Sequence, residues 1–539
     1  MRIVEKKQIG DKKVMPFTIP SGIVATEVSC LERMAREIPE LGILTTKSIG
    51  PQPRAGNREP ILAQYIPQGF VNAVGLTNPG AEEFARKLSL AHFPQDKFLL
   101  ASIFGKDVSE FVYVARTLEA HVDGFELNLS CPHAKGYGMQ LGQDKDVVGE
   151  ITREVVRITR KPVYAKLTPN AGNIGEIAKS AISAGAEGIV AINTVGPGYY
   201  SVDGSPVLTN KVGGLSGIGI TPIGLKCVRD IRQAIGENVP IIGMGGIRNI
   251  ADVEAYAEVG ATFFGIGSAL AGMSEREIKA YFSALRGDAE SSSWTNNAES
   301  LLKQVNMQYR KVRVNRKIDS ACDFKIIQTD EEMPCEAGQF VFAWIPNVGE
   351  KPFSIMDDNP LTLGILERGD FTRKIDSLQQ GDYFYVRGPY GRGVNVPQKS
   401  DVVLVGGGCG IAGLYLLAKR LSKESKVLTL LGGKDKEHIA YLDEFRKYGD
   451  VQVATEDGSL GRRGLVTDLM TDLKDGSYFF NCGPKPMVNA ILPLELKVSS
   501  PERVYSSVDY MTRCGVGVCG SCADSTGRRT CVEGPFVNP

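Results

Sequence analysis

The chain has 539 residues, which is too long for one hydrophobic core and predicts about three to four domains. Lys plus Arg and Asp plus Glu are equal at 62 each, so no net charge favours nucleic acid or an anionic membrane surface. Neither a signal-peptide h-region nor a stretch near ~18 consecutive apolar residues is present. We therefore expect a cytoplasmic protein with small-molecule partners, no nucleic acid and no membrane.

Residues 1–286 alternate short β-branched runs with helical stretches. The runs are GILTTK, KFLLASI, GFELNLS, PVYAKL, GIVAIN, PIIGMGG and FFGIGSA, and one more strand is expected near FTIPSG. Eight such units predict an α/β fold with a (β/α)8 TIM barrel, and a doubly wound sheet is the alternative. Residues 287–304 begin with GDAESSSWTNNAES, which lacks periodicity and predicts a linker.

One cysteine of the barrel lies where catalytic groups are expected. Cys131 lies on the loop after the predicted strand GFELNLS and is flanked by Asn128 and Ser130. The loops after barrel strands carry the chemistry of such folds, and a thiol there can exchange a proton. A buried structural cysteine is the alternative that this residue alone leaves open.

The second half of the chain changes character twice. Residues 305–397 hold closely spaced strand candidates, among them FKIIQT, QFVFAWI, LTLGILE and DYFYVRG, which predict an antiparallel β-barrel. Residues 398–503 open with DVVLVGGGCGIAGLYLLAKRL, a buried strand, a glycine turn and a helix. This pattern predicts a Rossmann-like nucleotide domain whose turn holds a pyrophosphate with Gly406, Gly407, Gly408 and Gly410.

The order of several motifs in this half resembles the ferredoxin reductase superfamily. KPFSI and RGPYGRG precede the glycine turn, and TEDGSLG and NCGPKPM follow it. The resemblance implies FAD on the barrel, bound by Lys351, Pro352, Phe353, Ser354, Gly388 and Gly391. Lys351 stands where Arg is usual, so a point charge replaces a bidentate contact. No basic cluster follows the turn at the 2′-phosphate distance, which favours NAD over NADP.

Residues 504–539 carry four closely spaced cysteines, Cys514, Cys519, Cys522 and Cys531. The spacing C-x4-C-x2-C-x8-C predicts the ligands of a [2Fe–2S] cluster in a small C-terminal domain. Gly515, Gly517 and Gly520 let the loop fold closely around a cluster. A structural zinc site is the alternative, although zinc ribbons favour paired CxxC motifs.

The first domain resembles a known family over almost its whole length. TTKSIGPQPRAGN, NAVGLTNPG, NLSCP, YAKLTP, AINTVGPG, NKVGGLSG, GMGGI and GIGSAL occur in the order found in the class 1 dihydroorotate dehydrogenases, which are FMN-dependent barrels. The second half is similar to the electron-transfer subunit of their NAD-linked class 1B form. The resemblance implies a fusion of the two, a homodimer through the barrel, and a role in pyrimidine biosynthesis.

The resemblance also implies residue roles. FMN would contact Ser21, Gly22, Lys47, Ser48, Asn128, Lys166, Ile192, Gly214, Ser216, Gly217, Gly245, Gly246, Gly267 and Ser268. The pyrimidine would contact Lys47, Asn72, Gly75, Leu76, Asn128, His133, Asn193 and Thr194, because amides and hydroxyls match a ring of C=O and N–H edges. Cys131 would remove the C5 proton while hydride leaves C6 for FMN, and electrons would continue through [2Fe–2S] and FAD to NAD+.

One residue departs from the family pattern. Dihydroorotate dehydrogenases have Asn after Cys-Pro, and this chain has His133. The CPH form is similar to dihydropyrimidine dehydrogenases, so an NAD(P)-dependent dehydrogenase or reductase of uracil-type pyrimidines is an alternative function. A non-catalytic redox carrier is an alternative of another class.

Overall fold

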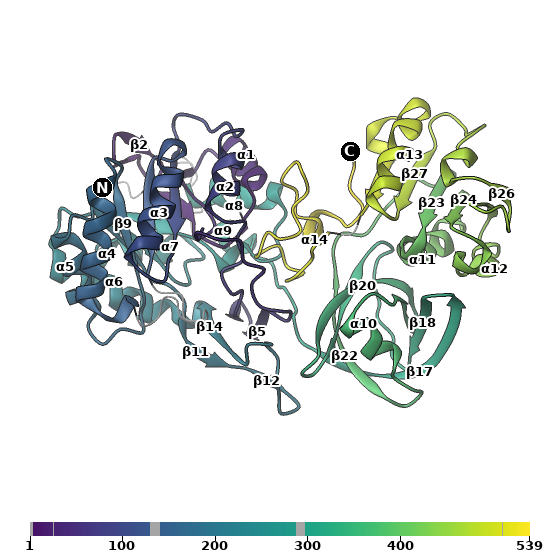
Figure 1. Ribbon diagram of the computed structural model, residues 1–539, viewed down its shortest axis with the longest axis horizontal. Helices are drawn as coiled ribbons and strands as arrows, with labels where there is room; N and C mark the ends of the chain where they lie inside the picture. The colour runs from purple at the N-terminus through teal and green to yellow at the C-terminus, as the bar shows by residue number, and fades with distance from the viewer. Residues whose placement is uncertain (1–3, 25, 130–140, 287–296, 509) are drawn as a thin grey trace. The chain divides into compact units, whose positions relative to one another are not determined.

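The structure is a computed structural model, and it describes residues 4–24, 26–129, 141–286, 297–508 and 510–539 (Figure 1). These residues divide into two compact units. The first comprises Met1–Asn306 with Val516–Arg528, and the second comprises Met307–Gly515 with Arg529–Pro539. The predicted cluster segment is therefore shared between the two units.

The first unit contains a closed barrel of eight strands, each parallel to its neighbours. The strands follow one another around the barrel in chain order: β3 (Phe17–Ile19), β4 (Leu41–Thr45), β7 (Phe98–Ile103), β8 (Gly124–Asn128), β9 (Val163–Leu167), β10 (Gly188–Ala191), β15 (Ile241–Met244) and β16 (Phe263–Gly265). The predicted TIM barrel is confirmed, and the doubly wound alternative is wrong for this part of the chain.

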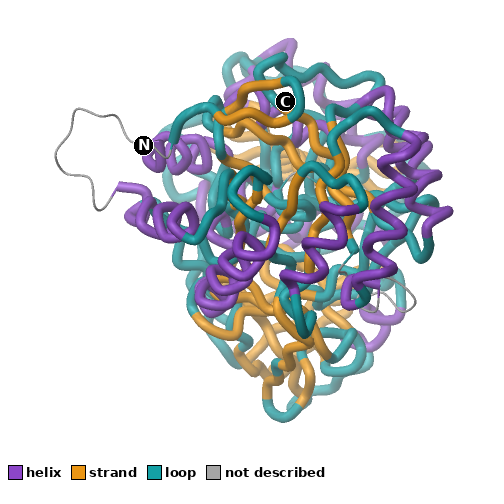
Figure 2. The backbone as a smooth tube through the Cα atoms, turned by 90° about the vertical axis from the view of Figure 1, so that its left-hand side faces the viewer, coloured by secondary structure: helices purple, strands orange, loops and turns teal. Residues whose placement is uncertain are grey.

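Helices surround these strands (Figure 2). They are α1 (Val28–Glu37), α2 (Ala81–Leu88), α3 (Val108–Leu118), α4 (Lys145–Ile158), α5 (Ile174–Ser183), α6 (Thr221–Ile235), α7 (Ile250–Glu258) and α8 (Glu275–Arg286), with short 3-10 turns η1 (Glu119–His121), η2 (Leu141–Gln143), η3 (Ile218–Ile220) and η4 (Ser268–Leu270). Several begin at a side chain that accepts a hydrogen bond from a first-turn N–H, namely Asp107, Asp144, Asn173 and Asn249.

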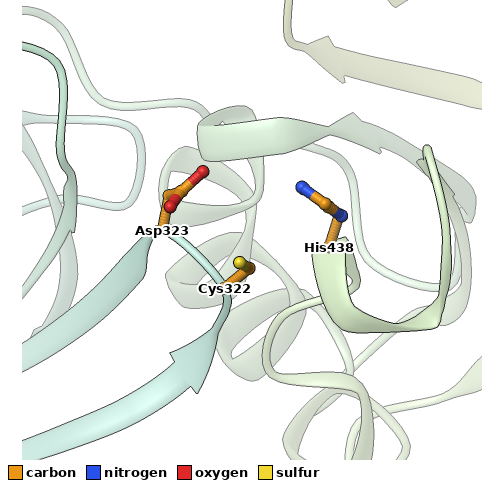
Figure 3. Close-up of side chains that lie close together, drawn as sticks. All are labelled: Cys322, Asp323 and His438. Atoms are coloured by element: carbon orange, nitrogen blue, oxygen red, sulfur yellow. The ribbon is translucent and has the colours of Figure 1, made fainter.

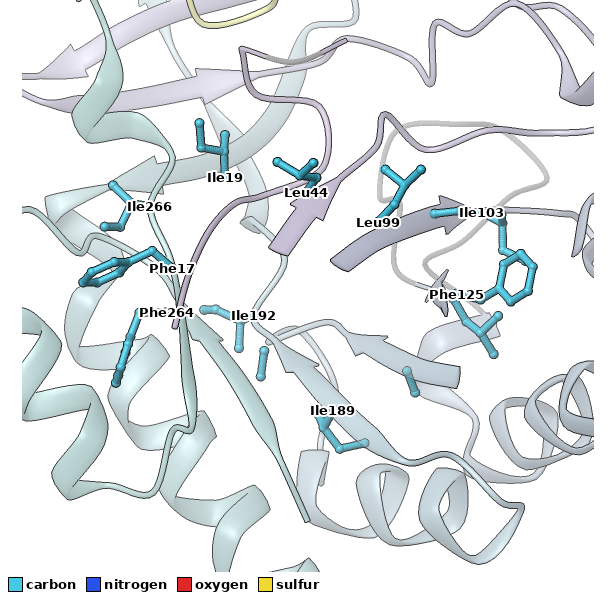
Figure 4. Packing of buried hydrophobic residues seen from close by; sticks show 14 of the residues in the cluster. Phe17, Ile19, Leu44, Leu99, Ile103, Phe125, Ile189, Ile192, Phe264 and Ile266 are labelled. Atoms are coloured by element: carbon cyan, nitrogen blue, oxygen red, sulfur yellow. The ribbon is translucent and has the colours of Figure 1, made fainter. Parts of the chain in front are cut away.

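Apolar side chains of the strands and helices form the core of this unit (Figure 4). The rings of Phe17 and Phe264 lie 6.2 Å apart on neighbouring strands. A hairpin of β1 (Lys7–Ile9) and β2 (Lys12–Val14) adds Ile9 and Val14 to a second cluster with inward-facing strand residues. The barrel is therefore a packed body whose ligands have to bind at its end.

An antiparallel sheet that the sequence did not predict is inserted into the barrel unit. It joins β5 (Leu62–Ile66), β6 (Gly69–Asn72), β11 (Val195–Tyr199) and β14 (Val212–Gly217), and a small hairpin of β12 (Ser201–Val202) and β13 (Ser205–Pro206) follows β11. The expected linker ends in a short helix, α9 (Asn297–Ser300), and Leu301 and Leu302 pack against the barrel core. Those last linker residues thus belong to the barrel unit.

The second unit contains a closed antiparallel barrel of six strands, as predicted. They are β17 (Arg310–Ala321), β18 (Phe324–Thr329), β19 (Phe340–Ile345), β20 (Gly349–Asp358), β21 (Leu361–Leu366) and β22 (Tyr383–Tyr390), with α10 (Asp370–Asp376) before β22.

A parallel sheet in the same unit has the strand order β26-β25-β24-β23-β27-β28. Its strands are β23 (Asp401–Gly407), β24 (Lys426–Gly433), β25 (Asp450–Thr455), β26 (Arg462–Arg463), β27 (Tyr478–Cys482) and β28 (Val504–Ser507). The helices and 3-10 turns between and after these strands are η5 (Gly408–Gly410), α11 (Ile411–Leu421), η6 (Lys436–His438), α12 (Leu442–Phe445), η7 (Val466–Leu469), α13 (Lys485–Val498) and η8 (Pro501–Arg503). A short helix, α14 (Thr530–Glu533), lies near the end of the chain. Among the helices of the described residues, none has both the length and the apolar character needed to cross a bilayer.

Candidate active site

A cavity lies at the carboxyl ends of the barrel strands, and most of the residues predicted for FMN and the pyrimidine line it. Those residues are Ser21, Gly22, Lys47, Ser48, Asn72, Gly75, Leu76, Asn128, Lys166, Ile192, Asn193, Thr194, Ser216, Gly217, Gly245, Gly246, Gly267 and Ser268. Gly214 is not among the lining residues; its carbonyl accepts a hydrogen bond from Asn72 Nδ2 at 3.1 Å. Cys131 and His133 lie outside the described residues.

A chain of polar groups links five neighbouring barrel strands, from the loops after β3 and β4 through β7 and β8 to β9. Ser48 Oγ lies 3.0 Å from Ser21 Oγ and 2.9 Å from Ser102 Oγ. Ser102 donates to Glu126 Oε1 at 2.7 Å, and Lys166 Nζ lies 3.3 Å from the same oxygen. Each partner fixes the next one, so the Lys166 ammonium is held at the cavity wall by neighbours that the sequence did not reveal, Ser102 and Glu126.

Three amide and hydroxyl residues extend this network toward the middle of the cavity. Asn128 Nδ2 donates to Ser48 Oγ at 2.8 Å, and Asn193 Nδ2 donates to Asn128 Oδ1 at 3.4 Å. The backbone N–H of Thr194 donates to Asn193 Oδ1 at 2.8 Å. The amide orientations are thereby set by the protein, as recognition of a planar ring with alternating donors and acceptors requires.

Glycines at the end of β14 and after β15 form a further part of the lining, called the glycine wall below, and at two of them a side chain would not fit. A Cβ on Gly217 would lie 2.0 Å from the Gln68 carbonyl oxygen, and a Cβ on Gly246 would lie 2.1 Å from Thr221 Oγ1. Both residues have positive φ, +93° and +80°. At both positions the cavity is therefore lined by backbone without a side chain, and Gly246 lies on the loop after the seventh barrel strand, one of the loops where such folds bind phosphate.

A buried tyrosine supports this glycine wall from behind. Tyr256 on α7 donates its hydroxyl to the Gly245 carbonyl at 2.7 Å, and burial raises the pKa of Tyr256, which keeps the hydroxyl a donor. Tyr256 is a positioning residue that sequence reasoning missed; its place on an amphipathic helix gave no functional signal.

The tail segment of the first unit reaches the same cavity, and Val518 and Cys519 line it. Val24 N–H donates to the Val518 carbonyl at 2.6 Å, and Gly272 N–H donates to the Val516 carbonyl at 2.8 Å. Farther along the segment, Cys30 Sγ contacts the Gly527 carbonyl at 3.4 Å. A predicted cluster ligand therefore borders the predicted flavin cavity, which the sequence alone did not indicate.

The four predicted cluster cysteines are all buried and form no disulfide. Cys514 and Cys531 belong to the second unit, and Cys519 and Cys522 to the first. Gly515, Gly517 and Gly520 adopt positive φ of +81°, +71° and +67°. This loop therefore uses its glycines for left-handed backbone, which side chains disfavour.

The residues predicted for FAD lie on two strands of the antiparallel barrel. Lys351, Pro352, Phe353 and Ser354 are in β20 and pair with β19. Gly388 lies in β22 and Gly391 directly follows it. A Cβ on Gly413 of α11 would lie 3.4 Å from Ser354 Oγ, so this stretch of β20 faces the start of the nucleotide-domain helix.

The glycine turn predicted for NAD lies where the parallel sheet reverses its strand order. Gly406 and Gly407 end β23, which has β24 on one side and β27 on the other, and Gly408 and Gly410 form η5 before α11. A Cβ on Gly410 would lie 2.0 Å from the Cys482 carbonyl oxygen. Open α/β sheets bind their ligands at this topological switch point, outside the carboxyl ends of the strands.

The closed barrel, with a cavity at its strand ends lined by two buried lysines, hydrogen-bonded amides and glycines, has the architecture of a barrel enzyme. The comparison with protein families identifies this one more closely, because the dihydroorotate dehydrogenase model matches residues 4–279, about half of the 539-residue chain. The chain belongs to the dihydroorotate dehydrogenase family and is an oxidoreductase.

Curated relatives agree with this assignment. The chain is 42% identical over 273 residues to the "Dihydroorotate dehydrogenase B (NAD(+)), catalytic subunit" of Pyrococcus horikoshii, covering 50% of this chain and 87% of that protein. The identically named protein of Methanocaldococcus jannaschii is 42% identical over 257 residues, 47% of this chain and 82% of its own.

A solved structure titled "Insights into flavin-based electron bifurcation via the NADH-dependent reduced ferredoxin-NADP oxidoreductase structure" is 26% identical over 42% of this chain and 87% of that one. Its TM-score is 0.39, which does not establish a shared fold.

Proposed function

We propose that this chain oxidises dihydroorotate to orotate in pyrimidine biosynthesis, with FMN bound in the barrel cavity. One observation carries the proposal: most of the residues predicted for the flavin ring, its phosphate and the pyrimidine line a single cavity in a member of the dihydroorotate dehydrogenase family. The cavity fits a phosphorylated planar ring, because two buried lysines lie on its wall and backbone is exposed where a phosphate needs N–H donors.

The chain's own groups have distinct tasks in this proposal. When bound, FMN supplies the acceptor for the electrons of the substrate. The glycine wall holds its phosphate, and Lys166, oriented by Glu126, places positive charge beside the ring. Lys47 pairs with the substrate carboxylate, and the asparagines orient the pyrimidine. Cys131 removes the proton from C5, and His133 contacts the substrate in place of the usual asparagine.

We further propose that electrons leave the barrel through a [2Fe–2S] cluster and FAD to NAD+. Cys514, Cys519, Cys522 and Cys531 would hold the cluster, and the support is their spacing, their burial and the position of Cys519 at the cavity wall. The relatives' name includes NAD(+), and the glycine turn at the end of β23 lies at the topological switch point of the parallel sheet, where such sheets bind their ligands.

A uracil-type substrate is the second candidate, because His133 departs from the family pattern. Anaerobic bleaching of the bound flavins by dihydroorotate and by dihydrouracil distinguishes the two. We expect dihydroorotate to bleach them. Bleaching by dihydrouracil alone would replace the proposal by the second candidate, and bleaching by NADH alone would favour a redox carrier.

Replacing the proposed base tests the mechanism. Cys131→Ser should slow flavin reduction by dihydroorotate about 10²–10⁴-fold, the range for a lost general base. Reduction from NADH should be unchanged in the same variant, which controls for cofactor loading. Undiminished reduction by dihydroorotate would remove Cys131 from this role.

The dimer through the barrel and the cytoplasmic location stay predictions. Sedimentation of the cofactor-loaded protein measures the first, and cell fractionation measures the second.

A further inference from the structure

Three side chains with metal-ligating atoms meet in the second unit, far in sequence from the cluster cysteines. Cys322 and Asp323 form the two-residue turn between β17 and β18, and His438 ends η6. One ligand atom from each lies within 4.8 Å of the others. Figure 3 shows the imidazole projecting toward the turn that carries the thiol and the carboxylate.

Backbone and side-chain hydrogen bonds hold the two segments together. Cys322 N–H donates to the Glu437 carbonyl at 2.9 Å. Tyr441 N–H donates to Ser320 Oγ at 3.1 Å, so a second bond ties the same hairpin to the residues after η6. The three ligand groups are therefore brought together by fixed backbone contacts.

The histidine ring is oriented as it is in metal sites. Its Nδ1 lies 2.7 Å from Asp435 Oδ1, and Asp435 also accepts the backbone N–H groups of Glu437 and His438. A carboxylate on one ring nitrogen fixes the tautomer and leaves Nε2 as the ligand, which is the usual outer partner of a metal-bound histidine.

We propose that Cys322, Asp323 and His438 bind one Zn²⁺ ion. Thiolate, imidazole and carboxylate together suit zinc, whereas Mg²⁺ and Ca²⁺ require oxygen ligands. Tetrahedral zinc needs ligand atoms about 3.3–3.8 Å apart. Because Cys322 and Asp323 are exposed, small side-chain rotations close the present spacing.

Three protein ligands leave the fourth coordination position of a tetrahedral zinc ion for water. Within the second unit, the ion would connect the β17–β18 hairpin of the antiparallel barrel to η6 of the parallel-sheet domain. This site is independent of the proposed oxidation.

The test uses the cofactor-loaded full chain, freed of loose metal with a chelator and titrated with Co²⁺ as a spectroscopic probe for zinc. We expect one Co²⁺ per chain with a thiolate-to-cobalt charge-transfer band that is absent from Cys322→Ser. His438→Gln should weaken binding at least 100-fold, and Asp435→Asn, which removes only the outer partner, about 10–100-fold.

Cys335→Ser is the matched control for the thiol. Cys335 lies in the same unit, burial raises its pKa to about 12, and its substitution should leave the band and the affinity unchanged. Zn²⁺ should also raise the unfolding temperature of the wild type and of Cys335→Ser, and not that of Cys322→Ser. Cobalt uptake that is the same in wild type, Cys322→Ser and His438→Gln, or uptake without a thiolate band, would overturn the proposal.

Discussion

Removing the guanidinium of Arg387 should destabilise the second unit more than any surface substitution. Arg387 Nε and Nη2 each donate to a Glu350 oxygen at 2.7 Å, and Nη1 donates to Tyr390 Oη at 3.1 Å and to the Cys514 carbonyl at 2.9 Å. The guanidinium carbon lies 4.0 Å from the centroid of the Phe342 ring. Both charged side chains are almost fully buried, at 1% and 0% exposure.

The magnitude follows from what the substitution leaves behind. Burial acts to lower the pKa of Arg387, and the Glu350 carboxylate outweighs it and holds that pKa well above its usual range. Arg387→Met keeps an apolar stem and leaves the Glu350 carboxylate buried beside Tyr309, which costs about 3–5 kcal/mol. For a unit of this size, that loss lowers the unfolding temperature by roughly 6–20 °C.

Calorimetry of the full chain, with the transition of the second unit resolved, measures the loss. Arg387→Met/Glu350→Leu removes both charges and should recover most of it, because replacing a whole buried pair is often neutral. Arg373→Met is the control, since Arg373 pairs with Asp370 on the surface of the same unit and should cost far less. A loss in Arg387→Met no larger than in the control, or no recovery in the double variant, would refute the reasoning.

Two further predictions concern a glycine and a buried acid. Gly246→Ala should lower FMN affinity about tenfold or more, as measured by equilibrium dialysis, because the new Cβ would lie 2.1 Å from Thr221 Oγ1. Gly204→Ala is the control. Gly204 has a similar φ of +75° and open space around it, so its substitution should leave FMN affinity unchanged. Burial raises the pKa of Glu495 to about 8, so the folded state binds the extra proton and stability falls as pH rises from about 4.5 to 8, by roughly 1.4 kcal/mol per pH unit. Glu495→Gln should flatten this slope in unfolding temperatures measured from pH 5 to 8, and an unchanged slope would contradict the assignment.

The barrel strands were predictable because each is a short apolar run between a turn and an amphipathic helix, a pattern set by local burial. The inserted antiparallel sheet was not, because β11 and β14 consist of VGPGY and VGGLSG, whose glycines have low strand propensity. β14 is held by pairing with β6, which is far away in the chain, and β11 pairs in turn with β14. Pairing of this kind leaves no local pattern in the sequence.

In the candidate site too, residues within a local motif could be predicted from the sequence, and residues placed by distant contacts could not. Residues with a motif around them, such as Lys47 and Asn128, were named from the sequence and line the cavity. Glu126 has no motif of its own; an acid inside the predicted strand GFELN was the only signal. The cysteine-rich tail loop gave no sign that it contacts the barrel. Its hydrogen bond from Ser29 Oγ to the Asp524 carbonyl joins residues 495 positions apart, and the sequence has no local pattern for such a contact.

Two buried ion pairs among the described residues, Glu350–Arg387 and Glu126–Lys166, differ in their geometry and surroundings. Glu350 and Arg387 meet in a bidentate arrangement at 2.7 Å, within the range of strong charge-assisted bonds, and tyrosines and a carbonyl complete the cluster. Lys166 lies 3.3 Å from Glu126, longer than that range, and it lines the cavity. Glu126 compensates the buried Lys166 ammonium, and the longer distance leaves that ammonium at the cavity wall. The first pair therefore closes a core, whereas the second lies where the proposed function requires a positive charge beside the flavin.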